Sequence, residues 1–145
     1  MPPISRQHLS HAIAQLIPSI IQGVQLDFFI KRGVTQTQFL VLVAIHAYGH
    51  CTMGALAKNM HVSMPTATGV VDRLVRTGFV RRSSQPEDRR QVIAELTAKG
   101  QDFIQEFQQV VRRRWEEVLR SLAPKELEAF YRVITKLQAQ LHAPR

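Results

Sequence analysis

Arginine side chains gather in one short stretch of this chain, and they offer its clearest chemistry. Between residues 73 and 90 six arginines stand against two acids, Glu87 and Asp88, a local charge balance of +4. A guanidinium group aligns paired N–H donors with the oxygens of a phosphate. The whole chain has 19 Lys+Arg against 11 Asp+Glu, a formal net charge of +8. A polyanion is therefore the expected partner, and the elements that carry the arginines decide which kind.

The first two of these arginines end a predicted helix whose outward face is small near its start. Ser63 is a typical N-cap residue, and Gly78 ends the helical pattern. The outward face and its flanks would present Ser63, Met64, Pro65, Thr66, Thr68, Gly69, Arg73 and Arg76. Such a helix can enter a DNA major groove about 12 Å wide and reach bases and phosphates. An ordinary surface helix with solvated arginines is the alternative.

The inward face of the same helix is apolar, and a hairpin is predicted to follow it. Four residues cluster at helical spacing: Ala67, Val70, Val71 and Leu74. Further along, Val92, Ala94 and Leu96 alternate with Gln91, Ile93 and Glu95, the period of a half-buried strand. Residues 79–83 can form the other arm.

The hairpin tip, residues 84–90, is polar and carries the other candidate DNA contacts, Asp88, Arg89 and Arg90. A basic loop beside a recognition helix can reach the minor groove, where narrow sites attract arginine. Asp88 precedes Arg90 by two residues and can pair with its guanidinium, which would hold it in one direction. The alternative is a solvated turn with a weak local ion pair.

Helical segments flank this unit on both sides. Thr35 and Gln38 have the spacing of a capping box, and Thr52 can cap a short helix over 53–60. An apolar face over 9–28 predicts a helix that Pro18 should kink or break and that Gly33 ends. Thr97 can cap a long helix. A last helix from Pro124 carries a coiled-coil-like seam of Leu127, Phe130, Ile134, Leu137 and Leu141.

These elements predict a mainly α protein with a small β-hairpin wing, a winged helix-turn-helix flanked by dimerisation helices. Residues 35–96 would form the DNA-binding part, and residues 1–34 and 97–145 the helical dimerisation part of one intertwined domain. The flanking helices are too apolar to stand alone in water, so they need each other or a second copy of the chain.

Other classes of function find little support. We see no phosphate-binding glycine loop, catalytic triad or metal-ligand cluster, which argues against an enzyme, a metal site or a cofactor. His8 and His11 lie one turn apart, but two histidines near a terminus are usually solvated. Residues 7–26 are uncharged yet interrupted by polar side chains, so no membrane span is predicted. The single cysteine, Cys51, excludes an intramolecular disulfide and suits the cytoplasm; a buried bystander thiol is favoured over a redox site.

The sequence resembles the multiple-antibiotic-resistance regulator (MarR) family over roughly residues 30–140. The similarity runs through Val34-Thr-Gln-Thr-Gln-Phe-Leu-Val-Leu, Met53-Gly-Ala-Leu-Ala-Lys, Val62-Ser-Met-Pro-Thr-Ala-Thr and Val71-Asp-Arg-Leu-Val-Arg-Thr-Gly-Phe-Val. It ends in the wing signature of Asp, any residue, Arg, five residues and Leu-Thr, represented here by Asp88, Arg90, Leu96 and Thr97.

This resemblance implies a two-fold dimer that represses, less often activates, nearby genes by binding a palindromic operator in double-stranded DNA. It implies that Arg90, oriented by Asp88, enters the minor groove and that Ser63 and Thr66 meet the major groove. Many relatives are released by small aromatic acids or phenols bound between the winged part and the dimer helices. Phe28, Phe29 and His46 are the candidate lining here, with plain core packing as their alternative role.

Two rival functions stay open. A winged-helix protein could organise DNA with little sequence preference, which the sequence does not exclude. A dimeric interaction module that has lost DNA binding is disfavoured by the intact Arg73, Arg76 and Arg90.

Overall fold

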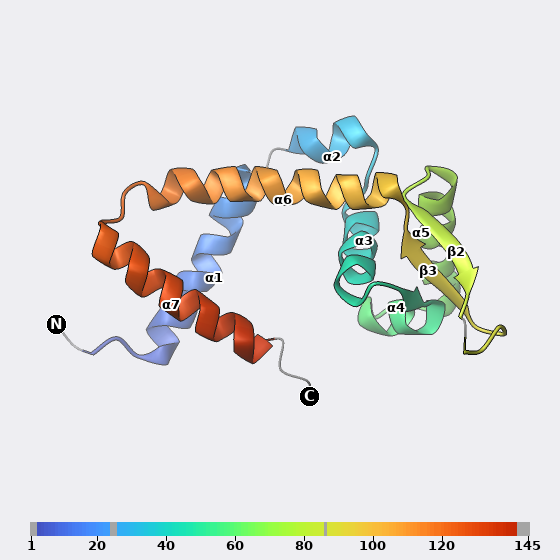
Figure 1. The fold of residues 1–145 in the computed structure, drawn as a ribbon, viewed down its shortest axis with the longest axis horizontal. Helices are drawn as coiled ribbons and strands as arrows, with labels where there is room; N and C mark the ends of the chain where they lie inside the picture. Colours follow the sequence, from blue (N-terminus) through green and yellow to red (C-terminus); the bar gives the residue numbers. More distant parts are fainter. Residues whose placement is uncertain (1–2, 24–25, 86, 142–145) are drawn as a thin grey trace.

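One long helix runs between the two regions of this protein: the winged part and the region of the first and last helices (Figure 1). The computed structural model describes residues 3–23, 26–85 and 87–141; residues 1–2, 24–25, 86 and 142–145, including one residue of the expected wing tip, lie outside it. The elements follow in the order α1 (Arg6–Gly23), α2 (Leu26–Arg32), α3 (Gln36–Tyr48), β1 (Cys51–Thr52), α4 (Met53–Asn59), α5 (Met64–Arg76), β2 (Val80–Ser84), β3 (Val92–Leu96), α6 (Ala98–Leu119) and α7 (Pro124–Leu141). The predicted class, mainly α with a small β wing, is confirmed.

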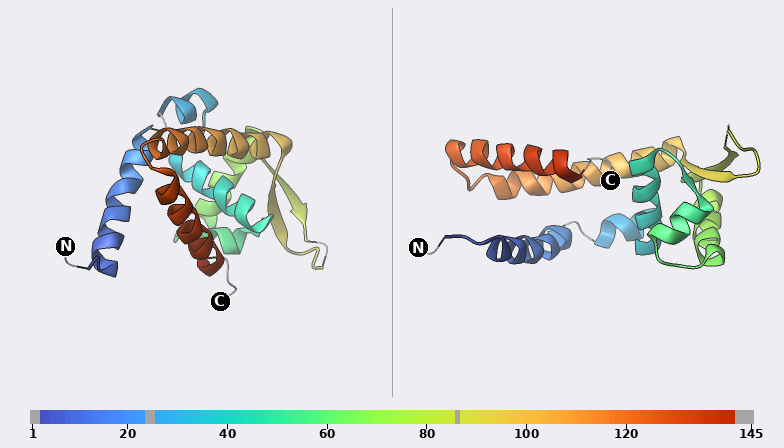
Figure 2. Two further views of the ribbon diagram at one scale, coloured as in Figure 1. Left: turned by 60° about the vertical axis from the view of Figure 1, so that its left-hand side comes forward. Right: turned by 90° about the horizontal axis from the view of Figure 1, so that it is seen from below.

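The long helix α6 has the winged part at one end and α1 and α7 at the other (Figures 1 and 2). Helices α3, α4 and α5 and the three strands gather around the start of α6, and α7 folds back from its far end. No helix in the described part of the chain is long and apolar enough to cross a membrane.

Four helices begin at the capping residues that the sequence predicts. Each cap side chain accepts a hydrogen bond from the backbone N–H three residues on, at Thr35, Thr52, Ser63 and Thr97. At α3 the capping box is complete, because the Gln38 side chain also accepts from the Thr35 backbone N–H at 2.8 Å. These caps satisfy donors that a helix start leaves unpaired, so they fix where each helix begins.

The sheet has three strands in the order β1-β3-β2, one more than the predicted hairpin. All pairs are antiparallel, with Ser83 and Thr52 on either side of Ile93. The predicted alternation placed Ile93 with the outward residues of β3, yet it is 2% exposed, whereas Val92 is 45% exposed. As the middle strand, β3 is covered on more sides than a two-stranded hairpin would be.

Of the two outcomes predicted at Pro18, a kink or a break, the break does not occur. The proline lies inside α1 and does not end it; the helix continues to Gly23, and α2 is a separate helix. A proline removes one hydrogen bond of the helix, and the remaining bonds can carry the chain past it. Gly33 ends α2 as expected, with a positive φ of 65° and its N–H donating to the Ile30 carbonyl.

Phenylalanine rings join α2 and α3 to α6. Ring centroids lie 4.6 Å apart for Phe39 and Phe107 and 5.3 Å apart for Phe28 and Phe103. Arg32 of α2 adds an ion pair to Glu106 of α6 and lies over the Phe28 ring. Tilted and edge-on ring pairs of this kind add to the burial of apolar area, so α6 is fixed against the winged part along its first half.

Gly100 occupies the tightest contact between α6 and the winged part. A Cβ atom built on it would lie 2.2 Å from the Phe79 carbonyl oxygen, in the turn that follows α5. The preceding cap residue, Thr97, donates from its backbone N–H to the same oxygen at 3.1 Å and from its hydroxyl to the Gly78 carbonyl at 2.5 Å. The helix start therefore lies directly on the backbone of this turn.

We expect Gly100→Ala to lower the free energy of unfolding by roughly 1–3 kcal/mol, because the new methyl group would meet a backbone oxygen that cannot rotate away. Gly54→Ala is the matched control, because Gly54 is the second residue of α4 as Gly100 is the third residue of α6. Nothing lies within 4 Å of a Cβ placed on Gly54, so this variant should be neutral or stabilising. Urea denaturation of both variants measures the difference. Equal stability of the two would contradict the tight contact.

Candidate nucleic-acid interface

The start of α5 presents small and hydroxyl-bearing residues to solvent. Ser63 caps the helix, and its hydroxyl lies 2.8 Å from the Thr66 hydroxyl, with both residues exposed. Met64 is 50% exposed, Pro65 and Gly69 are also exposed, and no atom comes within 4 Å of a Cβ placed on Gly69. This half of the helix can therefore approach another backbone or a base edge closely.

The opposite face of α5 holds the helix in the core. Ala67, Val71 and Leu74 are fully buried, and Val70 is half-buried. Thr68, predicted on a flank of the outward face, is half-buried too, so it is the least accessible of the eight candidate residues of this helix. The inward and outward faces that the sequence predicts are both present.

Two of the six arginines are neutralised by neighbouring acids. Arg82 of β2 pairs with Asp72 on α5 at 2.5 Å, and Arg81 pairs with Glu95, its cross-strand partner, at 3.1 Å. The first pair connects the wing to α5, and the second joins the two arms of the wing. Both are partly exposed, so they orient side chains more than they stabilise the fold.

The other four arginines in this stretch have no ion pair within the described residues. Arg73 and Arg76 are exposed near the end of α5, and Arg89 and Arg90 are exposed at the wing tip. The positive charge that remains for a polyanion is thus divided between the helix and the tip.

Neither ion pair was predicted from the sequence. Strand alternation places Arg81 and Arg82 on opposite faces of β2, so one of them had to point toward the helix packed against it. The spacing alone does not say that Asp72 would be its partner, because that contact needs the angle between α5 and the wing.

At the wing tip, Asp88 acts on the backbone. Its carboxylate accepts a hydrogen bond from the backbone N–H of Arg90 at 3.0 Å, and its own carbonyl accepts from Gln91 N–H at 3.0 Å. Gln85 N–H donates to the Gln91 carbonyl at 2.9 Å and closes the loop. We expected a pair with the Arg90 guanidinium; instead the short aspartate side chain closes a local turn, which such side chains commonly do.

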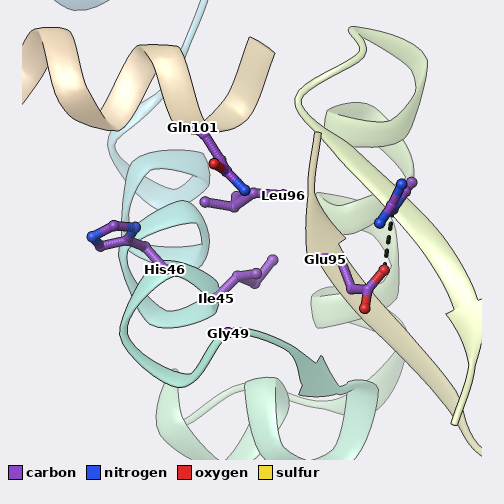
Figure 3. A pocket seen from close by; sticks show the side chains of 7 residues that line it. Ile45, His46, Gly49, Glu95, Leu96 and Gln101 are labelled. Carbon is purple, nitrogen blue, oxygen red and sulfur yellow. Dashed lines mark hydrogen bonds and ion pairs between the residues drawn. The ribbon is translucent and has the colours of Figure 1, made fainter. Parts of the chain in front are cut away.

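The three candidate ligand-pocket residues lie in different surroundings. Phe28 and Phe29 belong to the aromatic cluster with Phe103 and Phe107. His46 lines a cavity of about 240 Å³ whose lining includes neither phenylalanine. This cavity lies between α3, β3 and the start of α6 (Figure 3).

The polar groups of that cavity do not converge on a common point. His46 points away from Gln101, and the Glu95 carboxylate is taken up by its ion pair with Arg81 (Figure 3). Chemical catalysis or tight recognition of a small molecule needs several polar groups directed at one position. The cavity offers no such arrangement.

Other side chains that could carry chemistry, His8, Arg112 and Arg114, have partners within the chain. The described residues contain no group of three or more His, Cys, Asp or Glu side chains that could hold a metal ion. His8 lies at 3.1 Å from the Ser5 hydroxyl at the start of α1. In α6, Arg112 pairs with Glu116 and Arg114 with Glu117, so these arginines belong to a charged helix exterior.

Cys51 is buried in β1, at 3% exposure. Burial raises the pKa of its thiol above the ordinary value, because the thiolate would lose its hydration. A raised pKa keeps the thiol protonated and unreactive near neutral pH.

Comparison with known proteins agrees with this geometry. Residues 34–92 match the model of the MarR family. The chain is 29% identical over 128 residues to YsmB of Bacillus subtilis (strain 168), an HTH-type transcriptional regulator, with 86% of each chain covered. It is 29% identical over 120 residues to the HTH-type transcriptional repressor YetL of the same organism, covering 81% of this chain and 72% of YetL.

Among solved structures, the wild-type MarR of E. coli in its apo form is similar, with a TM-score of 0.63 and 26% sequence identity. The match covers 93% of this chain and 98% of that chain. The family and these relatives are transcription regulators and not enzymes.

Because Cys51 is buried, we expect its thiol to react slowly with disulfide reagents. In the folded protein at pH 8, its reaction with a disulfide reagent such as DTNB should be many-fold slower than in urea, and its rate should rise with pH beyond the range of an ordinary thiol. Stopped-flow absorbance measures both rates. Fast labelling at pH 7 in the native protein would indicate a low pKa and a redox-active residue instead.

Proposed function

We propose that this chain is a MarR-family transcription regulator that acts as a homodimer on a palindromic operator and represses the adjacent genes. In this proposal a small aromatic acid or phenol releases it from DNA. It works in the cytoplasm, where the operator is. The supporting observation is the pairing of a small, exposed helix start at α5 with four exposed arginines that have no ion pair in the described residues.

We assign the reading of sequence to the first half of α5. Thr66 offers a hydroxyl or a methyl group to a base edge, and Gly69 allows close approach in the major groove. Arg73 and Arg76 contact phosphates on the flanks. Arg90, at the tip of the wing, enters the neighbouring minor groove, with Arg89 beside it on the sugar-phosphate backbone.

We assign dimerisation to the helices at the far end of α6. Helix α7 has no buried residue, and its exposed apolar side chains are Leu127, Phe130, Tyr131, Val133, Leu137 and Leu141. Helix α1 exposes Leu9, Ile13, Leu16 and Ile17. Contiguous apolar surface of this extent favours burial against a second copy. Residues 35–96 would then bind DNA, and residues 1–34 and 97–145 would form the dimer.

Two-fold symmetry places the two recognition helices about 34–36 Å apart when they bind successive major grooves, one helical turn of DNA. The direction of regulation follows the repressor YetL. The effector class rests on the resemblance alone; Phe28 and Phe29, whose rings already touch, are its proposed contacts, whereas His46 lines a separate cavity.

Selection of bound duplexes from a random DNA pool tests this function. We expect a palindromic site preferred over random DNA by about 10³-fold or more. Sedimentation of the free protein should give a dimer at micromolar concentration. Gly69→Glu should abolish operator binding without unfolding the protein, because the added carboxylate projects into open space on the DNA-facing side.

Binding without sequence preference would instead support a DNA-organising protein, and a monomer would contradict the dimer. Repeating the selection with a panel of phenolic acids tests release; unchanged binding throughout would remove the effector from the proposal.

Variants of the wing tip should change the operator affinity in predictable directions. Arg90→Ala should weaken operator binding by roughly 1–3 kcal/mol, more on A·T-rich flanks. Asp88→Ala should weaken it less, because it opens the turn that holds Arg90 and leaves the guanidinium in place. Asp88→Asn keeps an acceptor for the Arg90 N–H and removes a negative charge near phosphates, so it should bind at least as well as the wild type.

Fluorescence anisotropy at constant ionic strength separates these cases. If Asp88→Ala bound as tightly as Asp88→Asn, the aspartate would be a bystander and the turn would hold without it.

A further inference from the structure

Three successive carbonyl groups at the end of α5 are bound by the first turn of α6. The Thr77 carbonyl accepts from the Lys99 ammonium at 2.7 Å. The Gly78 carbonyl accepts from the Thr97 hydroxyl, and the Phe79 carbonyl from the Thr97 backbone N–H. The recognition helix thus ends on the helix that leads to the proposed dimer interface.

Lys99 is the adjustable member of this set. The two bonds of Thr97 also cap α6 and depend on the backbone, whereas Lys99 contributes only through an exposed side chain. Its ammonium lies 4.5 Å from the centre of the Phe79 ring, and its Cδ is 3.7 Å from a Cβ position built on Gly78. A cation at the C-terminal end of a helix and over an aromatic face gains from both the helix dipole and the ring.

The position of this contact makes it a pivot. Helix α6 has 22 residues, so it is about 33 Å long at about 1.5 Å per residue. A tilt of about 5° between α5 and α6 would displace the far end of such a helix by about 3 Å. Ring contacts on the first half of α6 resist the tilt from the side of α2 and α3, and Lys99 resists it from the side of α5.

We propose that Lys99 is a positioning residue: its bond to the Thr77 carbonyl fixes the angle between α5 and α6 and so sets the distance between the two recognition helices of the dimer. Lys99 acts through the helix and touches no base. This inference rests on the proposed function, because the distance has meaning only for a dimer on a two-half-site operator.

A direct phosphate contact is the competing role, since Lys99 is exposed and basic. The two roles differ in which DNA they affect. A phosphate contact contributes to every half-site separately and to the salt dependence of binding. A positioning contact contributes only when both half-sites must be met at one fixed spacing.

The test uses the full chain and three kinds of duplex built on the selected operator. They are the operator itself, the same half-sites with the spacer changed by one or two base pairs, and a single half-site. Lys99→Met removes the ammonium and keeps the apolar stem, Lys99→Gln repeats the charge loss with a polar group, and Lys99→Arg keeps a cation.

For Lys99→Met and Lys99→Gln we expect about three- to tenfold weaker binding to the operator, comparable binding to the half-site, and a flatter dependence on spacer length. Lys99→Arg should restore the spacing preference. The salt slope should be the same for all variants.

Equal losses on operator and half-site, with a shallower salt slope, would make Lys99 a phosphate contact and overturn the inference. An unchanged spacing profile in both charge-loss variants would overturn it too. A wild-type protein with no spacing preference would overturn the proposed palindromic dimer itself, which distinguishes that failure from a failure of Lys99.

Discussion

The absent side chain at Gly100 is the constraint on which the arrangement of this protein depends. Because no Cβ is present, the first turn of α6 lies against the Phe79 carbonyl, and Thr97 can donate to that carbonyl and to the Gly78 carbonyl. The end of α5, the beginning of the wing and the beginning of α6 therefore meet within a few ångströms. A bulkier residue would push α6 away and disconnect the proposed DNA-reading surface from the proposed dimer interface. This also gives a physical reason for the Leu-Thr pair that closes the wing signature.

The packing of the wing against α5 also decides which arginines stay exposed. A count of arginines over 73–90 suggests one continuous basic patch, but the fold divides it into two kinds of side chain. Arg81 and Arg82 are paired with acids and stiffen the wing and its contact with α5. Arg73 and Arg90 stay exposed, one on the helix and one at the tip. Asp72 and Glu95 thus have a structural role, and the exposed positive charge is confined to the helix and the wing tip.

How far the sequence predicts this structure depends on the range of each interaction. The helix starts at Thr35, Ser63 and Thr97 are local, since a cap side chain and the N–H it bonds are three residues apart, and all were predicted. The third strand, the burial of Ile93 and the Asp72–Arg82 pair need the spatial relation of separate elements, and none was. The predicted break at Pro18 does not occur for a different reason, because the cost of one lost hydrogen bond is smaller than the cooperative gain of continuing the helix. The wing tip is an intermediate case. An interaction between Asp88 and Arg90 was predicted, but the Asp88 carboxylate accepts from the backbone N–H of Arg90 and does not pair with its guanidinium.

The regions at the two ends of α6 differ in whether a single chain gives them a hydrophobic core. At the winged end the chain buries Leu42, Ile45, Leu56 and Leu74 fully, and its polar caps are satisfied internally. At the other end α7 buries nothing, so a single chain leaves that end without a core of its own. In the proposed dimer the missing core comes from the partner, and α6 is the rigid element that spans both regions. The angle at its first turn then matters more than any contact along its length, because a small rotation there is enlarged at the far end. A regulator built this way needs only a weak, exposed contact at the pivot to couple the dimer to the spacing of its DNA site.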